Sequence, residues 1–172
     1  GRTPDQAREG RLTLMGAGDR AAYDTLKPVL DDLGENDFHL GATGAGHTIK
    51  LNNNFLAMTT ATAVAECFAM ADAAGVSRAD MYGVVSAGPL HSGMMDFVKA
   101  YAVDGDPTKL AFAVRNGRKD VGYYARMAEE AGAVSLISPA ARQALALAGA
   151  QGFADRMVPE MVDYLSSLNG RG

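Results

Sequence analysis

The sequence has little cysteine, no excess of positive charge and no metal-binding pattern, and each shortage excludes a class of protein. Its single cysteine, Cys67, cannot form an internal disulfide, so a disulfide-held secreted scaffold is excluded and a cytoplasmic location is expected. With 16 basic and 20 acidic residues the formal net charge is −4, which argues against nucleic acid or an anionic membrane as a partner. The three histidines lack metal-ligand spacing, so no metal site is expected.

The length and composition fit one globular domain, or one domain with part of another. The chain has 172 residues, of which 48% are hydrophobic and 21% charged. No uninterrupted apolar run reaches membrane length, so a soluble protein is expected. The sequence begins at Gly1 without an initiator methionine, and we expect it to be the later part of a longer protein.

The first forty residues alternate between strand and helix patterns. Residues 11–15 predict a short strand, residues 20–33 a helix, and residues 37–40 a second strand. Pro28 is expected to kink or restart the helix, and Gly34 to end it in a left-handed turn. Two strands are too few to form a sheet that buries itself, so this β-α-β unit resembles the end of a larger domain.

Beyond Gly46 the pattern is helical throughout. Residues 47–74 contain neither proline nor glycine and are apolar on nearly every side, which predicts one long helix surrounded by other helices. Residues 77–80 have the form of a capping box that opens a shorter helix. Further helices are expected at about residues 94–102, 112–131, 139–150 and 155–168, with Ser138 as an N-cap. The predicted fold class is mainly α.

Three glycines, Gly41, Gly44 and Gly46, stand between the second strand and the long helix. Their order is G-x-x-G-x-G, whereas the dinucleotide fingerprint is G-x-G-x-x-G, and no further strand follows the helix. The pattern therefore favours a joint between two domains over a nucleotide site.

The first turns of the long helix carry a polar stripe. Lys50, Asn53 and Asn54 are spaced i, i+3 and i+4 and so lie on one helix face. An unpaired buried amide or ammonium costs several kcal/mol, so these groups are solvated in a cleft or satisfied by partners. Two interpretations stay open: a site for proton transfer, or an interdomain hydrogen-bond network without a catalytic role.

A second polar cluster lies on the helix expected at residues 112–131. It consists of Arg115, Arg118, Lys119 and Asp120. Clusters of this kind usually form a solvated charged face. The sequence contains no Gly-x-Ser-x-Gly elbow and no other activated nucleophile, so a hydrolase is not favoured.

One run joins the glycines to the polar stripe: Gly41-x-x-Gly44-x-Gly46-x-x-x-Lys50-x-x-Asn53-Asn54. This run resembles the β-hydroxyacid dehydrogenase family, in which a Rossmann domain precedes a helical domain of the 6-phosphogluconate dehydrogenase type. Three more blocks match the family in the right order, so the resemblance covers essentially the whole chain: residues 8–14, Glu66 with Gly75, and Lys119-Asp120. It implies a β-α-β remnant of the Rossmann domain at residues 1–40, then an all-helical domain at residues 41–172 that begins with a long interdomain helix.

The resemblance also implies a role for each matching residue. Lys50 corresponds to the catalytic lysine that protonates the carbonyl oxygen as hydride arrives from NAD or NADP, where a cationic donor stabilises the developing alkoxide. Asn54 corresponds to the amide that holds the substrate, with Asn53 as a supporting contact and Asp120 as a companion in the same cleft. Lys119 corresponds to the lysine that reaches the cofactor near its nicotinamide.

The triplet Gly1-Arg2-Thr3 stands where most relatives carry Ser-Gly-Gly in the substrate loop, and it resembles the sulfolactaldehyde reductase branch. The Arg2 guanidinium suits a sulfonate or carboxylate through paired hydrogen bonds, although a residue at the start of a chain can equally lack a fixed position. The resemblance therefore implies a small anionic aldehyde or hydroxy acid as substrate, as for sulfolactaldehyde reductase or 3-hydroxyisobutyrate dehydrogenase.

Taken as a whole, the resemblance implies the C-terminal part of an NAD(P)-dependent oxidoreductase that interconverts a small acidic 3-hydroxy compound and its semialdehyde or aldehyde. These residues lack the dinucleotide fingerprint, so alone they are expected to be inactive. The apolar helices predict a homodimer or higher homo-oligomer. The alternative is a non-catalytic helical dimerisation module of the same fold. Convergence of Lys50, Asn54, Lys119 and Asp120 on one cleft would favour the enzyme.

Overall fold

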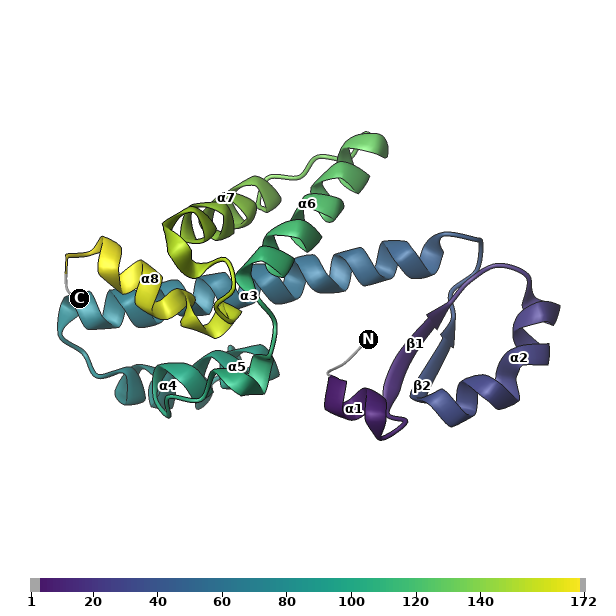
Figure 1. The fold of residues 1–172 in the computed structure, drawn as a ribbon, viewed down its shortest axis with the longest axis horizontal. Helices are drawn as coiled ribbons and strands as arrows, with labels where there is room; N and C mark the ends of the chain where they lie inside the picture. Colours follow the sequence, from purple (N-terminus) through teal and green to yellow (C-terminus); the bar gives the residue numbers. More distant parts are fainter. Residues whose placement is uncertain (1–3, 171–172) are drawn as a thin grey trace. The chain divides into compact units, whose positions relative to one another are not determined.

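The computed structural model describes residues 4–170 and is mainly helical, which confirms the predicted fold class (Figure 1). The predicted substrate-loop residues Gly1, Arg2 and Thr3 lie outside the described residues. In chain order the elements are α1 (Pro4–Arg8), β1 (Leu12–Gly16), α2 (Arg20–Leu33), β2 (Gly34–His39), α3 (Ala45–Ala74), α4 (Arg78–Ser86), α5 (Gly93–Ala102), η1 (Pro107–Leu110), α6 (Val114–Glu130), α7 (Ser138–Ala148), η2 (Gly149–Phe153), η3 (Val158–Glu160) and α8 (Met161–Leu168).

The chain divides into two compact units, Gly1–Asn53 and Asn54–Gly172. The division falls within α3, which is one continuous helix. The expected domain limit between residues 40 and 41 stays a prediction.

In the first unit β1 and β2 pair in parallel, joined by α2, as expected for a β-α-β unit. The N-cap of α2 is Asp19, whose carboxylate accepts a hydrogen bond of 2.7 Å from the backbone N–H of Ala22. The apolar residues of α2 remain about half exposed because a two-stranded sheet offers little surface to cover them: Leu26, Val29 and Leu33.

Three details of this unit differ from the prediction. α2 continues through Pro28 to Leu33, so the helix does not restart there. Gly34 has a φ of −141°, which is extended, so the predicted left-handed turn is wrong. Glycine is required there for space, because a Cβ would lie 2.8 Å from the Leu14 side chain and 2.9 Å from the Leu12 carbonyl oxygen. The short helix α1 has no counterpart in the sequence prediction.

The glycines between β2 and α3 allow backbone conformations and close contacts that other residues would not. Gly41 and Gly44 have φ values of 85° and 98°, in the left-handed region that favours glycine. A Cβ on Gly46 would lie 2.2 Å from the Met15 carbonyl oxygen, so only glycine lets α3 begin directly against β1. These are the uses expected at a joint between a sheet and a helix.

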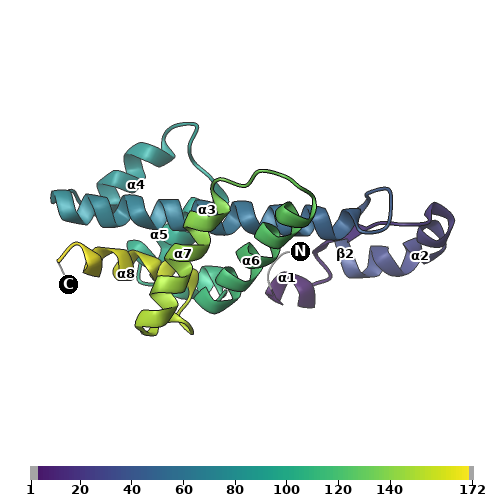
Figure 2. The same cartoon turned by 90° about the horizontal axis from the view of Figure 1, so that it is seen from above.

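The core of the second unit forms where α5, α6, α7, η3 and α8 meet α3 (Figures 1 and 2). Each of these elements contributes fully or nearly fully buried apolar side chains. The largest are Phe68 from α3, Val98 from α5, Val121 from α6, Leu145 from α7, Val158 from η3, and Met161 and Tyr164 from α8.

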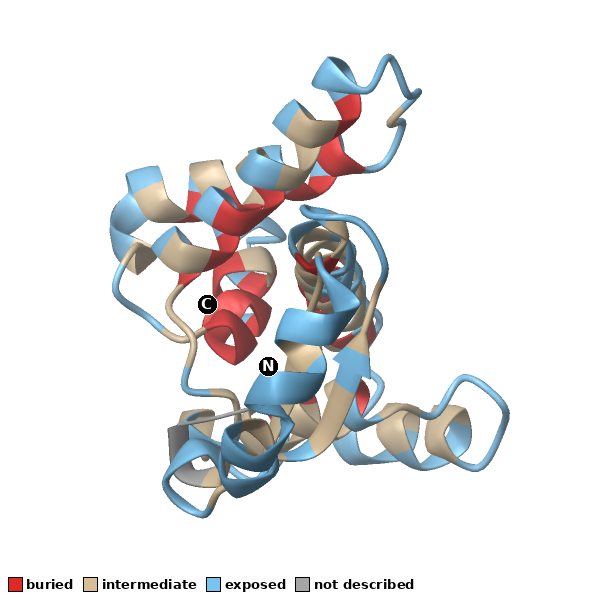
Figure 3. Cartoon of the chain, turned by 90° about the vertical axis from the view of Figure 1, so that its right-hand side faces the viewer, coloured by how far each residue is buried: buried red, intermediate tan, exposed pale blue. Residues whose placement is uncertain are grey.

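Helix α3 is not surrounded by other helices in this chain, so that prediction is wrong. One side carries core residues such as Phe68, whereas Leu56 and Met70 on the other are 66% and 63% exposed; Figure 3 colours each residue by burial. Among the described residues α3 alone is long and apolar enough to cross a membrane. Its most apolar 18-residue stretch has a mean hydropathy of 1.2, and 39% of that stretch is buried. Such a helix is weak evidence for a membrane, because a core helix passes the same test. The core residues of α3 fit that second interpretation.

The C-terminal helices also begin differently from the prediction. Ser138 is the first residue of α7 rather than its N-cap, and its hydroxyl hydrogen-bonds to that of Ser135. The helix expected from residue 155 begins only at Met161. The chain reaches it through a π-helical turn broken at Gly152, which has a φ of 93°, and through η3.

An ionic cluster ties the C-terminal end of α3 to α4 and α8. The Arg78 guanidinium donates hydrogen bonds of 3.0 and 2.7 Å to the Asp72 carboxylate, and the Ser166 hydroxyl donates one of 2.7 Å. The hydrogen bond from Arg78 is the main cause that lowers the pKa of Asp72, and the one from Ser166 adds to it.

The core predicts a sharp difference between two leucines of α7. Leu145→Ala is expected to lower the free energy of unfolding by about 2–5 kcal/mol, because Leu145 is fully buried and truncation leaves a cavity. The matched control Leu147→Ala, at a position 46% exposed, is expected to cost less than about 1 kcal/mol. Denaturant unfolding followed by circular dichroism measures both, and equal losses would contradict the described core.

The ionic cluster predicts a pH-dependent contribution. Because the pKa of Asp72 is lowered on folding, its contribution is fully present above the unfolded pKa of about 3.9 and is lost as the pH falls through the lower folded pKa. Asp72→Asn is therefore expected to cost about 1–2 kcal/mol at pH 7 and distinctly less near pH 3 in denaturant unfolding.

The control is Asp104→Asn, which removes an exposed ion pair with Lys99 and is expected to cost less than about 1 kcal/mol. An Asp72→Asn cost that does not shrink in acid would rule out this role for the carboxylate.

Candidate functional site

The site centres on a buried carboxylate that α6 presents to α3. Asp120 is only 8% exposed, and Asn54 Nδ2 donates a hydrogen bond of 2.7 Å to its Oδ2. A buried charge is costly unless it is paired, and Lys119 supplies the positive partner, with Nζ 3.3 Å from Asp120 Oδ1. Lys119 itself is half exposed. The three polar side chains thus form one connected group.

An aromatic pair lies directly beside this group. Phe55 follows Asn54 on α3, and its ring stacks on Tyr124 of α6 with centroids 4.0 Å apart and planes 7° apart. Gly117, one turn before Asp120, lets the helices approach closely, because a Cβ there would lie 3.0 Å from Met58 Sδ. Sequence reasoning missed Phe55, Tyr124 and Gly117. Their only local signal is that they adjoin the polar residues or lie one turn from them.

The two remaining predicted residues of α3 have free polar groups. Lys50 is half-buried and Asn53 is exposed, and neither has a hydrogen bond or ion pair with another described residue. Lys50 lies one turn before Asn54 in the same continuous helix, and i, i+4 positions share a face. The helical spacing is what relates Lys50 to Asn54.

The structure brings together Asn54, Lys119 and Asp120, and helical spacing relates Lys50 to Asn54. The prediction of a solvated charged face holds for Lys119 and the two arginines of the cluster, which are exposed, but not for Asp120, which is buried. Asp120 instead belongs to the contact between α6 and α3. Among residues 4–170, no group of three or more histidine, cysteine or acidic side chains could hold a metal ion.

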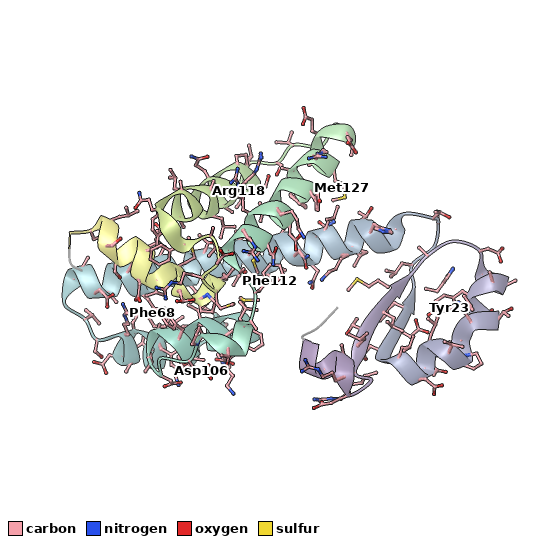
Figure 4. All side chains as sticks on the ribbon, viewed as in Figure 1. Tyr23, Phe68, Asp106, Phe112, Arg118 and Met127 are labelled. Carbon is pink, nitrogen blue, oxygen red and sulfur yellow. The ribbon has the colours of Figure 1, made fainter. Side chains whose placement is uncertain are left out.

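A second feature lies elsewhere on α6, where an open cleft of about 450 Å³ forms between α6 and α7. Figure 4 shows the side chains of α6, with Arg118 and Met127 labelled. The lining of the cleft is mostly cationic: Arg115, Arg118, Lys119, Gly122, Tyr123, Ala125, Arg126, Glu129 and Arg142. The sequence cluster gave no sign that Arg142 of α7 joins it.

Comparison with known proteins identifies the family. Residues 44–165, more than half of the chain, match the family described as the NAD-binding domain of NADP-dependent 3-hydroxyisobutyrate dehydrogenase. The chain therefore belongs to this family, which confirms the resemblance seen in the sequence and the expected cofactor class, NAD or NADP.

Individual relatives agree with this assignment. The chain is 26% identical over 165 residues to glyoxylate/succinic semialdehyde reductase 2 of Arabidopsis thaliana, covering 96% of this chain and 46% of that protein. It is 34% identical over 125 residues to L-threonate dehydrogenase of Escherichia coli K12, covering 72% of this chain and 41% of that protein. The chain thus spans less than half the length of these curated relatives.

The fold is also similar to a solved structure. The crystal structure of 3-hydroxyisobutyrate dehydrogenase from Salmonella typhimurium aligns with a TM-score of 0.83 and 29% identity, covering 95% of this chain and 57% of that one. The match extends the similarity beyond residues 44–165 to nearly the whole chain.

The contact between α6 and α3 predicts different effects for two neighbouring asparagines. Asn54→Ala removes the hydrogen bond to buried Asp120 and is expected to lower the free energy of unfolding by about 1–3 kcal/mol. Asn53→Ala, at an exposed position one residue earlier, is expected to cost no more than about 0.5 kcal/mol. Thermal and denaturant unfolding of both variants provide the measurement. A neutral Asn54→Ala would show that the bond does not stabilise the contact.

Proposed function

We propose that this chain is the C-terminal, substrate-binding part of an NAD(P)-dependent oxidoreductase that interconverts a small acidic hydroxy compound and its aldehyde or semialdehyde. The observation that carries the proposal is the connected group Asn54–Asp120–Lys119. Lys50 precedes Asn54 by one turn of the same helix, and its side chain has no partner among the described residues.

Lys50 is the proposed proton donor. In the direction of reduction, the bound nicotinamide cofactor supplies a hydride to the carbonyl carbon. The carbonyl oxygen then becomes an alkoxide, and the Lys50 ammonium donates its proton there to give the hydroxyl group. The cation stabilises negative charge that develops only as the reaction proceeds, so it lowers the barrier more than it strengthens substrate binding.

Asn54 is the proposed substrate-positioning amide. Its Nδ2 donates to Asp120 Oδ2, which fixes the amide plane and leaves Oδ1 and the second N–H of Nδ2 for a ligand. One acceptor and one donor at a fixed orientation suit a hydroxyl or carbonyl group next to the one that reacts. Asn53, exposed on the adjacent position, is the proposed supporting contact.

Lys119 is proposed to reach the nicotinamide end of the cofactor, with Asp120 as its companion on the substrate side of the cleft. The Lys119 ammonium has three N–H donors and a single carboxylate partner, at 3.3 Å, so donors remain for a carboxamide or ribose hydroxyl. This donor set fits the polar end of a dinucleotide. The proposal places the Gly-x-Gly-x-x-Gly fingerprint in the rest of the longer protein and takes residues 1–40 as the end of its Rossmann domain.

The proposed substrate is small and anionic. The relatives named above are a glyoxylate/succinic semialdehyde reductase and an L-threonate dehydrogenase, and each named compound carries a carboxylate with the reacting aldehyde or hydroxyl group. Gly1, Arg2 and Thr3 are the proposed substrate loop that meets this acid group. The exposed apolar side of α3, with Leu56 and Met70, fits the proposed homo-oligomer.

The proton-donor role predicts the outcome of two substitutions at one position. In the full-length protein that contains this chain, Lys50→Met is expected to reduce kcat about 10²–10⁴-fold. Lys50→Arg keeps the charge but is a far weaker acid, so it is expected to restore little of the rate. Steady-state kinetics with aldehyde substrates, and fluorescence titration of NADPH, provide the measurements.

The matched control is Lys109→Met, which changes a largely exposed lysine and is expected to keep wild-type kcat. NADPH affinity should stay within about twofold in all three variants, because the role proposed for Lys50 concerns the proton and not the cofactor. Wild-type turnover in Lys50→Met would remove Lys50 from the mechanism and favour the non-catalytic dimerisation module.

A further inference from the structure

The cationic cleft between α6 and α7 is separate from the group around Asp120. Arg118, Gly122, Arg126 and Glu129 are spaced three or four residues apart, so they form one stripe along α6. At 100° per residue, this stripe lies on the side of the helix opposite Asp120. Lys119 lies between the two features: it pairs with Asp120 and also lines the cleft.

Positive charge is concentrated in this cleft. Five cationic side chains line it, whereas Glu129 is its only acidic lining residue, in a chain whose formal net charge is −4. Arg115 is neutralised by an ion pair with Asp155, and Lys119 by the one with Asp120. Arg118 and Arg142 have no acidic partner among residues 4–170. Like charges that line one cleft repel each other, and a bound anion would reduce that repulsion.

The shape of the cleft leaves the guanidinium groups accessible. Arg118, Arg126 and Arg142 are exposed. A Cβ on Gly122 would be in ordinary van der Waals contact with Arg142 Nε at 3.5 Å, so a branched side chain there would occupy the space beside that group. The Tyr123 ring lies at the edge of the cleft, with Lys119 Nζ and Arg126 Cζ each 5.8 Å from its centroid. The volume of about 450 Å³ is within the range of small-molecule sites.

We propose that this cleft binds a compact polyanion that carries adjacent phosphate groups, such as a di- or triphosphate. Guanidinium groups bind phosphate through paired hydrogen bonds, and two arginines without acidic partners on facing helices can hold neighbouring phosphates. Three of the lining arginines, Arg118, Arg126 and Arg142, have no acidic partner among residues 4–170, and a single carboxylate would pair with only one of them. Because the stripe lies opposite Asp120, this site is additional to the one proposed for the reaction.

The test measures binding of inorganic tripolyphosphate to the 172-residue chain by isothermal titration calorimetry at about 0.1 M salt. The expected result is saturable binding at one site per chain. Arg118→Gln and Arg142→Gln should each weaken it by about tenfold or more, because each removes hydrogen bonds to a charged group. Circular dichroism and the melting temperature verify that each variant is folded.

Two further variants separate the site from the overall charge. Arg20→Gln removes an exposed arginine from α2, in the first unit, and is expected to change the affinity less than twofold. Gly122→Val changes no charge but fills the space beside Arg142, and is expected to weaken binding about as much as Arg142→Gln. Non-saturable binding, or an equal loss in Arg20→Gln, would overturn the proposal.

Competition identifies the source of the phosphates. Displacement of tripolyphosphate by ATP but not by NADP⁺ would assign the site to free nucleotide polyphosphates, and displacement by NADP⁺ would assign it to the phosphates of the dinucleotide. Equal affinity for citrate would overturn the preference for phosphate. None of these measurements depends on catalysis, so a failure of the Lys50 proposal would leave this one intact.

Discussion

The contact between α6 and α3 is the constraint on which the candidate site depends. It buries a carboxylate, Asp120, and the cost of that burial is offset because Asn54 meets it from the facing helix. The stacked rings of Phe55 and Tyr124 join α3 and α6 beside this hydrogen bond, and Gly117 allows the two helices to approach closely. Without α3, the Asp120 carboxylate would be solvated. The hydrogen bond to Asp120 is what gives the Asn54 amide a defined orientation.

Helix α6 combines three kinds of surface within seventeen residues. Val114 and Val121 enter the core, Asp120 meets Asn54 at the edge of that core, and the arginines line the cleft toward α7. The first two surfaces pack against the core and α3, whereas the exposed arginines of the third lie along the cleft.

The sequence predicted what depends on local pattern. The spacing of apolar residues identified α2 and α3 closely, and the spacing of Lys50 and Asn54 identified the polar face of α3. The hydrogen bond from Asn54 to Asp120 joins positions 66 residues apart, and no periodic pattern within one helix can predict such a contact. The family resemblance was what placed the two residues in one cleft. The role of Arg142 in the cleft and the extended backbone of Gly34 were missed, because both follow from neighbours distant in sequence.

Gly46 has a mechanical consequence for the first unit. The start of α3 lies directly against the Met15 carbonyl, with no side chain between them. Because packed backbones leave little free volume, a shift of α3 relative to β1 would create either a steric clash or a cavity at this contact. Gly41 and Gly44, which have left-handed backbones, both precede α3, whereas Gly46 in its first turn packs directly against β1. Lys50 follows Gly46 by one turn of α3, so its backbone belongs to the part of the helix that starts directly against β1.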